Sequence, residues 1–141
     1  MIDPIILLFL SSGLFLGWAL GANDAANVFG TAVGTKMVSW RNAAIICSIF
    51  VILGAVISGA GTSQTLGKLG AITALPGAFM TALSAGFAVF AMTKSGLPVS
   101  TSQAIVGAII GWNLFSNQAT DTATLTKILS TWIICPLLAA I

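Results

Sequence analysis

The sequence predicts an all-α membrane protein, a polytopic helical bundle with broken helices and a re-entrant half-helix. Of its 141 residues, 57% are hydrophobic and only 6% are charged. A soluble domain would carry about a quarter ionic residues to cover its surface, so lipid must be the solvent for most of this chain. The apolar residues also fall into long runs between short polar stretches, and one run is too short to cross a bilayer.

The composition also argues against several classes of function. Without histidine and with only two cysteines, the chain lacks the ligands of a zinc or other transition-metal site and the parts of a catalytic triad. We therefore expect neither an enzyme nor a cofactor, and a bound cation would have to be hard and oxygen-ligated. The net charge of +2 is too small and too scattered for a nucleic-acid surface.

The long apolar runs predict four spanning helices. About 20 helical residues at 1.5 Å each match a hydrocarbon core of roughly 30 Å. Lys36 and Arg41 lie together between the first two runs, which favours an N-terminus on the outer side of the membrane. The expected spans are residues 4–22, 42–60, 77–93 and 125–141.

Three other segments are expected to be irregular or short. A straight helix from Pro4 to Lys36 would be roughly 50 Å long, so a break is predicted in the segment 21–36. Residues 61–75 are rich in glycine and hydroxyl residues and predict a loop or a short interfacial piece. Residues 101–115 follow Pro98 and are too few for a span, which predicts a half-helix.

The last apolar run reaches the end of the sequence without a polar stop, so residues 1–141 are expected to form a single transmembrane repeat of a longer protein. Residues 61–68 superficially resemble the phosphate-binding loop (P-loop) of nucleotide-binding proteins. That motif is rejected because five residues separate its glycines instead of four, and Leu69 stands where Ser or Thr must hold Mg²⁺.

Asp24 is the first candidate functional residue, because a carboxylate between two apolar stretches is costly unless it is paired or lines a wet cavity. Asn23 and Asn27 are one helical turn apart and can add amide oxygens beside it. Such a cluster suits Na⁺ or a proton. The alternative is an interfacial loop in which these residues merely cap the next helix.

Three hydroxyl residues, Ser100, Thr101 and Ser102, form the second candidate, at the expected start of the half-helix. A helix N-terminus presents unpaired N–H groups and partial positive charge, so it can bind a tetrahedral oxyanion without arginine. An ordinary Ser/Thr cap is the alternative. Together the two stretches fit a secondary transporter, in which broken helices hold the substrate and the driving cation near the bilayer midplane.

The segment Gly21-Ala-Asn-Asp-Ala-Ala-Asn27 resembles the GANDxxN motif of the inorganic phosphate transporter (PiT) family, and Pro98-Val-Ser-Thr-Ser-Gln103 resembles that family's P-V-S-T-S/T segment. The resemblance implies two inverted repeats, of which this chain is the N-terminal one, and a homodimer in the cell membrane. It assigns phosphate binding to Asp24, Asn27 and residues 100–103, and Na⁺ binding to Asn23, Asp24 and Asn27.

One position departs from the family pattern. Gln103 stands where many members have histidine, so a protonatable group is lost and Na⁺ is favoured over H⁺ as the coupling ion. The predicted function is therefore Na⁺-coupled symport of inorganic phosphate. Open alternatives are transport of sulfate or another tetrahedral oxyanion, a channel built from half-helices, and a structural membrane subunit without a site.

Overall fold

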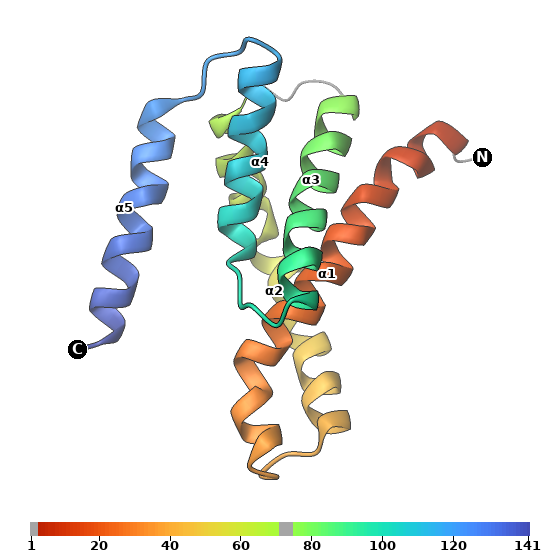
Figure 1. Ribbon diagram of the computed structural model, residues 1–141, viewed down its shortest axis with the longest axis vertical. Coiled ribbons are helices and arrows are strands. Elements are labelled where there is room, and N and C mark those ends of the chain that lie inside the picture. The colour runs from red at the N-terminus through yellow and green to blue at the C-terminus, as the bar shows by residue number, and fades with distance from the viewer. Residues whose placement is uncertain (1–2, 71–74) are drawn as a thin grey trace.

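A computed structural model describes residues 3–70 and 75–141 of the chain, and every regular element in these ranges is a helix. Four of the helices are long and apolar enough to cross a membrane, which agrees with the predicted number of spans. The fifth, α4, has 15 residues and a length of about 22 Å, less than the hydrocarbon core. In chain order the helices of Figure 1 are α1 (Pro4–Gly34), α2 (Trp40–Leu69), α3 (Leu75–Lys94), α4 (Thr101–Phe115) and α5 (Thr122–Ala139).

The break predicted within residues 21–36 is wrong, because α1 is one uninterrupted helix of 31 residues. Asp3 caps its first turn and Pro4 suits its first position, whereas no proline follows within the helix. Gly21 alone is too weak a breaker between good helix formers. A helix longer than the hydrocarbon core can tilt in the membrane, and Figure 1 shows α1 crossing its neighbours at an angle.

The loop predicted for residues 61–75 is also wrong over its first part, because α2 remains helical to Leu69. The Thr65 hydroxyl donates to the Gly61 carbonyl at 3.0 Å, so this polar side chain is satisfied within the helix. In lipid the backbone must bond internally, which keeps a glycine-rich segment helical. Residues 71–74 lie outside the described residues. The starts and ends of α3 and α5 agree with the predicted spans to within about one turn.

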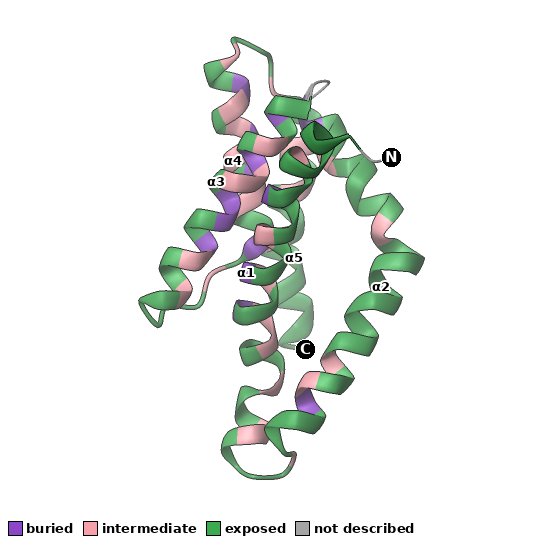
Figure 2. Ribbon diagram, turned by 90° about the vertical axis from the view of Figure 1, so that its right-hand side faces the viewer, coloured by how far each residue is buried: buried purple, intermediate pink, exposed green. Residues whose placement is uncertain are grey.

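The packed part of the molecule consists of α1, α3 and α4. Gly86 of α3 allows α1 to approach closely, since a Cβ there would lie 2.7 Å from the Phe15 ring. Gly77 plays the same role beneath Trp112 of α4, at 2.9 Å. In Figure 2 most buried residues lie on these three helices, whereas α2 and α5 are exposed along most of their length.

The connection between α3 and α4 positions the polar residues. The two helices are antiparallel, and their loop at residues 95–100 lies beside the middle of α1 (Figure 1). From that level α1 continues by ten residues to Gly34, and α2 returns along it. The N-terminus of α4 therefore faces the middle of α1.

Candidate functional site

The two polar stretches singled out in the sequence meet where the α3–α4 loop contacts α1. The Thr101 hydroxyl, at the first residue of α4, lies 3.3 Å from both carboxylate oxygens of Asp24. Thr101 is buried and Asp24 is half-buried. This hydrogen bond joins residues 77 positions apart in the sequence and brings the two candidate motifs into one site.

The start of α4 has the geometry expected of an anion-binding helix end. Ser100 is the N-cap, and its hydroxyl accepts a hydrogen bond from the Gln103 backbone N–H at 3.4 Å. The Asp24 carboxylate lies at this end of the helix, where the helix dipole favours negative charge. The Asp24 carboxylate thus occupies the position in which the N-terminus of α4 would stabilise a bound anion.

Asn23 of α1 contacts both α3 and the loop that follows α3. Its side chain is 5% exposed, and its amide lies between the Thr93 hydroxyl and the Val99 carbonyl oxygen, each at 2.9 Å. Two oxygens at this distance repel without a hydrogen between them, so the amide nitrogen faces Val99 and the amide oxygen accepts from Thr93. In this arrangement the nitrogen also lies 3.3 Å from Asp24 Oδ1.

Five of the six predicted substrate residues line a common opening, which we call the polar hollow. Its volume is about 390 Å³. Asn27 extends the row along α1, with its amide 3.3 Å from that of Asn23. Gln103 is not part of the lining; it is exposed, and its backbone N–H serves the helix cap. The lining residues are Asp24, Asn27, Pro98, Val99, Ser100, Thr101 and Ser102.

Asp24 of the polar hollow lies within a long apolar helix, where a carboxylate needs partners. Asp24 precedes Lys36 by 12 residues, which is about 18 Å along a helix. Lys36 and Arg41 flank the tight connection from α1 to α2, and such basic residues lie at the membrane surface. Half the thickness of a hydrocarbon core is about 15 Å, so with Lys36 at the membrane surface Asp24 would lie within the apolar layer.

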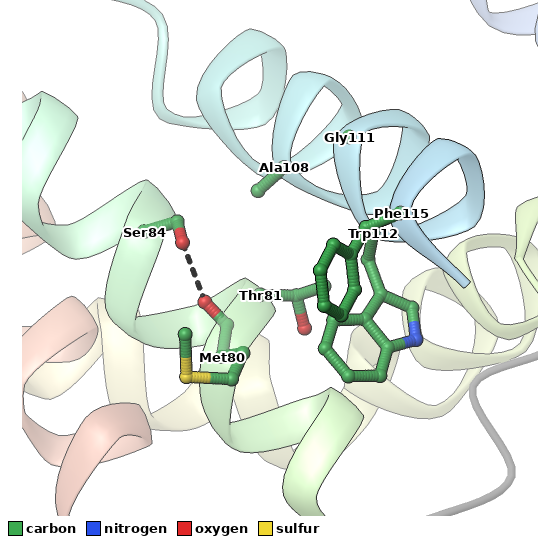
Figure 3. A pocket seen from close by; sticks show the side chains of 7 residues that line it. All are labelled: Met80, Thr81, Ser84, Ala108, Gly111, Trp112 and Phe115. Carbon is green, nitrogen blue, oxygen red and sulfur yellow. Dashed lines mark hydrogen bonds between the residues drawn. The ribbon is translucent and has the colours of Figure 1, made fainter.

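Two other openings in the described residues are mainly apolar, although Thr93 and Lys94 line one of them. The one in Figure 3 lies between α3 and α4, has a volume of about 280 Å³ and contains no charged side chain. The Ser84 hydroxyl there donates back to the Met80 carbonyl at 2.7 Å, so it is occupied within its own helix. The other, of about 220 Å³, lies between α1 and α3 beside Trp18 and Phe90. The polar hollow is the opening with the chemistry of an ion site.

Two groups of the site were missed in the sequence: the Thr93 hydroxyl and the Val99 carbonyl. Thr93 ends an apolar run, so nothing in its sequence context separates it from a helix-terminal threonine. Val99 contributes a backbone atom, which carries no sequence signal. Both approach Asn23 because of how α1 packs on α3 and the following loop.

The sequence model of the phosphate transporter family matches residues 20–141, a range that contains Asp24 and all of α4. The chain belongs to the phosphate transporter family. The family is one of transporters, the class of protein that the sequence predicted. It also agrees with the family resemblance carried by the motifs at residues 21–27 and 98–103.

Individual phosphate transporters are similar over nearly the whole chain. A Pyrococcus furiosus protein named as a phosphate permease is 33% identical across 99% of the chain and 36% of its own length. Sodium-dependent phosphate transporter 1 of Mus musculus is 34% identical across 86% of the chain and 19% of its own length. Inorganic phosphate transporter 2-1, chloroplastic, of Arabidopsis thaliana is 30% identical across 92% of the chain and 24% of its own length.

The chain thus spans about a third or less of the length of these relatives. No solved structure matches it.

Proposed function

We propose that this chain is one repeat of a Na⁺-coupled symporter of inorganic phosphate, and that phosphate binds in the polar hollow. The observation that carries the proposal is the hydrogen bond from Thr101, at the N-terminus of α4, to Asp24 in the middle of α1. It places the Thr101 hydroxyl, a donor at a helix end suited to an anion, beside the Asp24 carboxylate. Intramembrane acids are functional by default because their burial is costly.

Phosphate would displace the Asp24 carboxylate from the start of α4. The hydroxyls of Ser100 and Ser102 are exposed at the hollow, and together with Thr101 they can donate to phosphate oxygens. Phosphate keeps a proton at neutral pH, so it can donate a hydrogen bond to Asp24 while its other oxygens accept from α4. Sulfate has no proton to donate and would meet repulsion from the carboxylate.

A rotation of the Asn23 amide would create a cation site. Turned by 180°, its oxygen would lie 2.9 Å from the Val99 carbonyl and 3.3 Å from Asp24 Oδ1. Oxygens brought this close repel one another unless a cation lies between them. In residues 3–70 and 75–141 no three His, Cys, Asp or Glu side chains cluster, so one carboxylate with amide and carbonyl oxygens suits a monovalent hard cation.

Two further observations support Na⁺ over H⁺. Gln103 cannot exchange a proton in the physiological range, unlike the histidine of many family members. The mouse relative is named as sodium-dependent. Na⁺ bound beside Asp24 would neutralise the carboxylate and favour phosphate, and by linkage phosphate would raise Na⁺ affinity by the same factor.

The arrangement of α3 and α4 supports alternating access. Their loop lies level with Asp24, so we propose that α4 is a re-entrant half-helix whose N-terminus reaches the membrane interior. The hollow is open on one side, and an inverted second repeat would complete it. The greater length of the relatives leaves room for that repeat. We further propose a homodimer in the cell membrane.

Another tetrahedral oxyanion is the second candidate substrate, because helix N–H groups and hydroxyls recognise a tetrahedral shape and not a particular element. Radiolabelled phosphate uptake into proteoliposomes that contain the complete transporter separates the possibilities. We expect uptake to require an inward Na⁺ gradient and to be inhibited by unlabelled phosphate but not by sulfate. Uptake driven by a pH gradient without Na⁺ would replace the coupling ion, and equal inhibition by sulfate would remove the phosphate selectivity.

A further inference from the structure

Thr93 does not line the polar hollow, but it contacts Asn23, the residue next to Asp24. Its hydroxyl lies 2.9 Å from the Asn23 amide on α1 and 2.8 Å from the Val89 carbonyl in its own helix, α3. Thr93 is half-buried and Asn23 is buried. At this depth an amide group without a partner would be strongly destabilising, so the hydroxyl has a direct influence on how Asn23 is oriented.

A hydroxyl suits either orientation of the amide, because it can donate one hydrogen bond and accept others. With the Asn23 nitrogen toward Val99, the Thr93 hydroxyl donates to the Asn23 oxygen. With the oxygen toward Val99 and Asp24, the hydroxyl accepts from the Asn23 nitrogen and donates to the Val89 carbonyl. Thr93 makes one hydrogen bond in the first arrangement and two in the second.

We propose that Thr93 is a positioning residue that allows Asn23 to turn from a hydrogen-bond donor into an oxygen ligand when Na⁺ binds. This role rests on the proposed Na⁺ coupling. Because the second arrangement has one more hydrogen bond from Thr93, the hydroxyl favours the cation-bound form. Removing the hydroxyl therefore weakens Na⁺ binding selectively, without removing any atom that touches phosphate or the cation.

Thr81 provides a matched control on the same helix. Its hydroxyl makes the same kind of bond to carbonyls of α3, Gly77 at 2.9 Å and Ala78 at 3.0 Å, and no bond to α1. Thr81 is 8% exposed and thus more buried than Thr93. Replacement of Thr81 by valine tests what the loss of a buried hydroxyl in α3 does to folding alone.

The test is the Na⁺ concentration that gives half-maximal phosphate uptake by the complete transporter in proteoliposomes, at saturating phosphate. For Thr93→Val we expect this concentration to rise about fivefold, the effect of one hydrogen bond, with a maximal rate close to that of the wild type. Thr93→Ser and Thr81→Val should match the wild type. If Thr93→Val does not reach the membrane, Thr93→Ala carries the same expectation.

An unchanged Na⁺ requirement in the Thr93 variant, or an equal rise in Thr81→Val, would overturn the positioning role while leaving the proposed function in place. Wild-type uptake that does not respond to Na⁺ would instead reject the coupling ion, and the role of Thr93 with it. The two failures are distinguished by the wild-type protein.

Discussion

Some polar side chains of the packed helices α1, α3 and α4 bond to other elements, whereas the hydroxyls of the exposed helices α2 and α5 described below bond within their own helix. In the first group, Asn23 and Asp24 bond to residues of other helices or of the connecting loop. In the second group, serine and threonine hydroxyls return to carbonyls of their own helix, as in Ser48 to Ala44 and Ser130 to Thr126, both at 2.8 Å.

This difference distinguishes the residues of the candidate site from polar side chains that are merely compatible with lipid. A hydroxyl that donates to a carbonyl of its own helix has its hydrogen bond in lipid without a partner on another helix. A carboxylate or amide cannot do so, and it requires partners that the fold must supply. Cross-helix bonds to Asp24 and Asn23 therefore mark the site, whereas the many hydroxyls of α2 and α5 do not.

Replacement of Asp24 by asparagine should have the largest effect. The variant keeps the shape but removes the charge that pairs with Thr101 and the cation, so Na⁺-driven phosphate uptake should fall by about 100-fold, as for loss of a hydrogen bond to a charged group. Thr65→Val in α2 is the control, and it should remain within about twofold of the wild type. Normal uptake in the Asp24 variant would fit a structural membrane subunit without a site.

Replacement of Thr101 by valine should have the next largest effect. Valine has the size of threonine but cannot donate to Asp24 or to phosphate, so the phosphate concentration for half-maximal uptake should rise about tenfold. Thr101→Ser keeps the hydroxyl and should restore most of the affinity. If valine and serine behave alike, the Thr101 hydroxyl has no part in binding.

A pair of glycine substitutions compares packing in the two regions. Gly86→Ala places a methyl group against Phe15 and should lower the free energy of unfolding by about 1–3 kcal/mol. Gly54→Ala in α2 meets no atom within 4 Å and should be neutral or stabilising, because alanine favours helix. Thermal denaturation in detergent measures both. Equal destabilisation would show that α2 is as tightly packed as α3.

The smallest effect is expected at Asp121, the N-cap of the exposed helix α5. The hydrogen bond from the Thr124 hydroxyl, at 2.5 Å, holds the pKa of the Asp121 carboxyl below its ordinary value of 3.8. A lowered pKa means that ionised Asp121 stabilises the fold above that ordinary value and that this stabilisation is lost as the pH falls through the lowered pKa.

The thermal midpoint of Asp121→Ala should therefore lie slightly below that of the wild type at pH 7, and the difference should shrink in acid. Phosphate uptake should be unchanged. A difference that grows as the pH falls would contradict this role for Asp121.

Much of the fold could be predicted because the apolar runs are long and clearly bounded. The two errors, at residues 21–36 and 61–69, have different causes. The break at 21–36 was predicted from the length of a helix perpendicular to the membrane, and α1 is instead inclined to its neighbours. The loop at 61–69 was predicted from glycine and hydroxyl residues, but lipid offers the backbone of such a segment no other partner. Asp24 and Ser100–Ser102 could be singled out as candidates because polar groups stand out in apolar sequence. Thr93 was not, since its role depends on the packing of α1 against α3.

In the proposed mechanism Asp24 and Thr101 act as one phosphate site. Its most direct test is equilibrium binding of radiolabelled phosphate at saturating Na⁺ to the complete transporter and to Asp24→Asn, Thr101→Val and the double variant. If the two residues act together, the double variant should lose less binding free energy than the sum of the single losses, by about 1 kcal/mol. Losses that add within about 0.5 kcal/mol would show that the two residues act independently and would contradict the shared site.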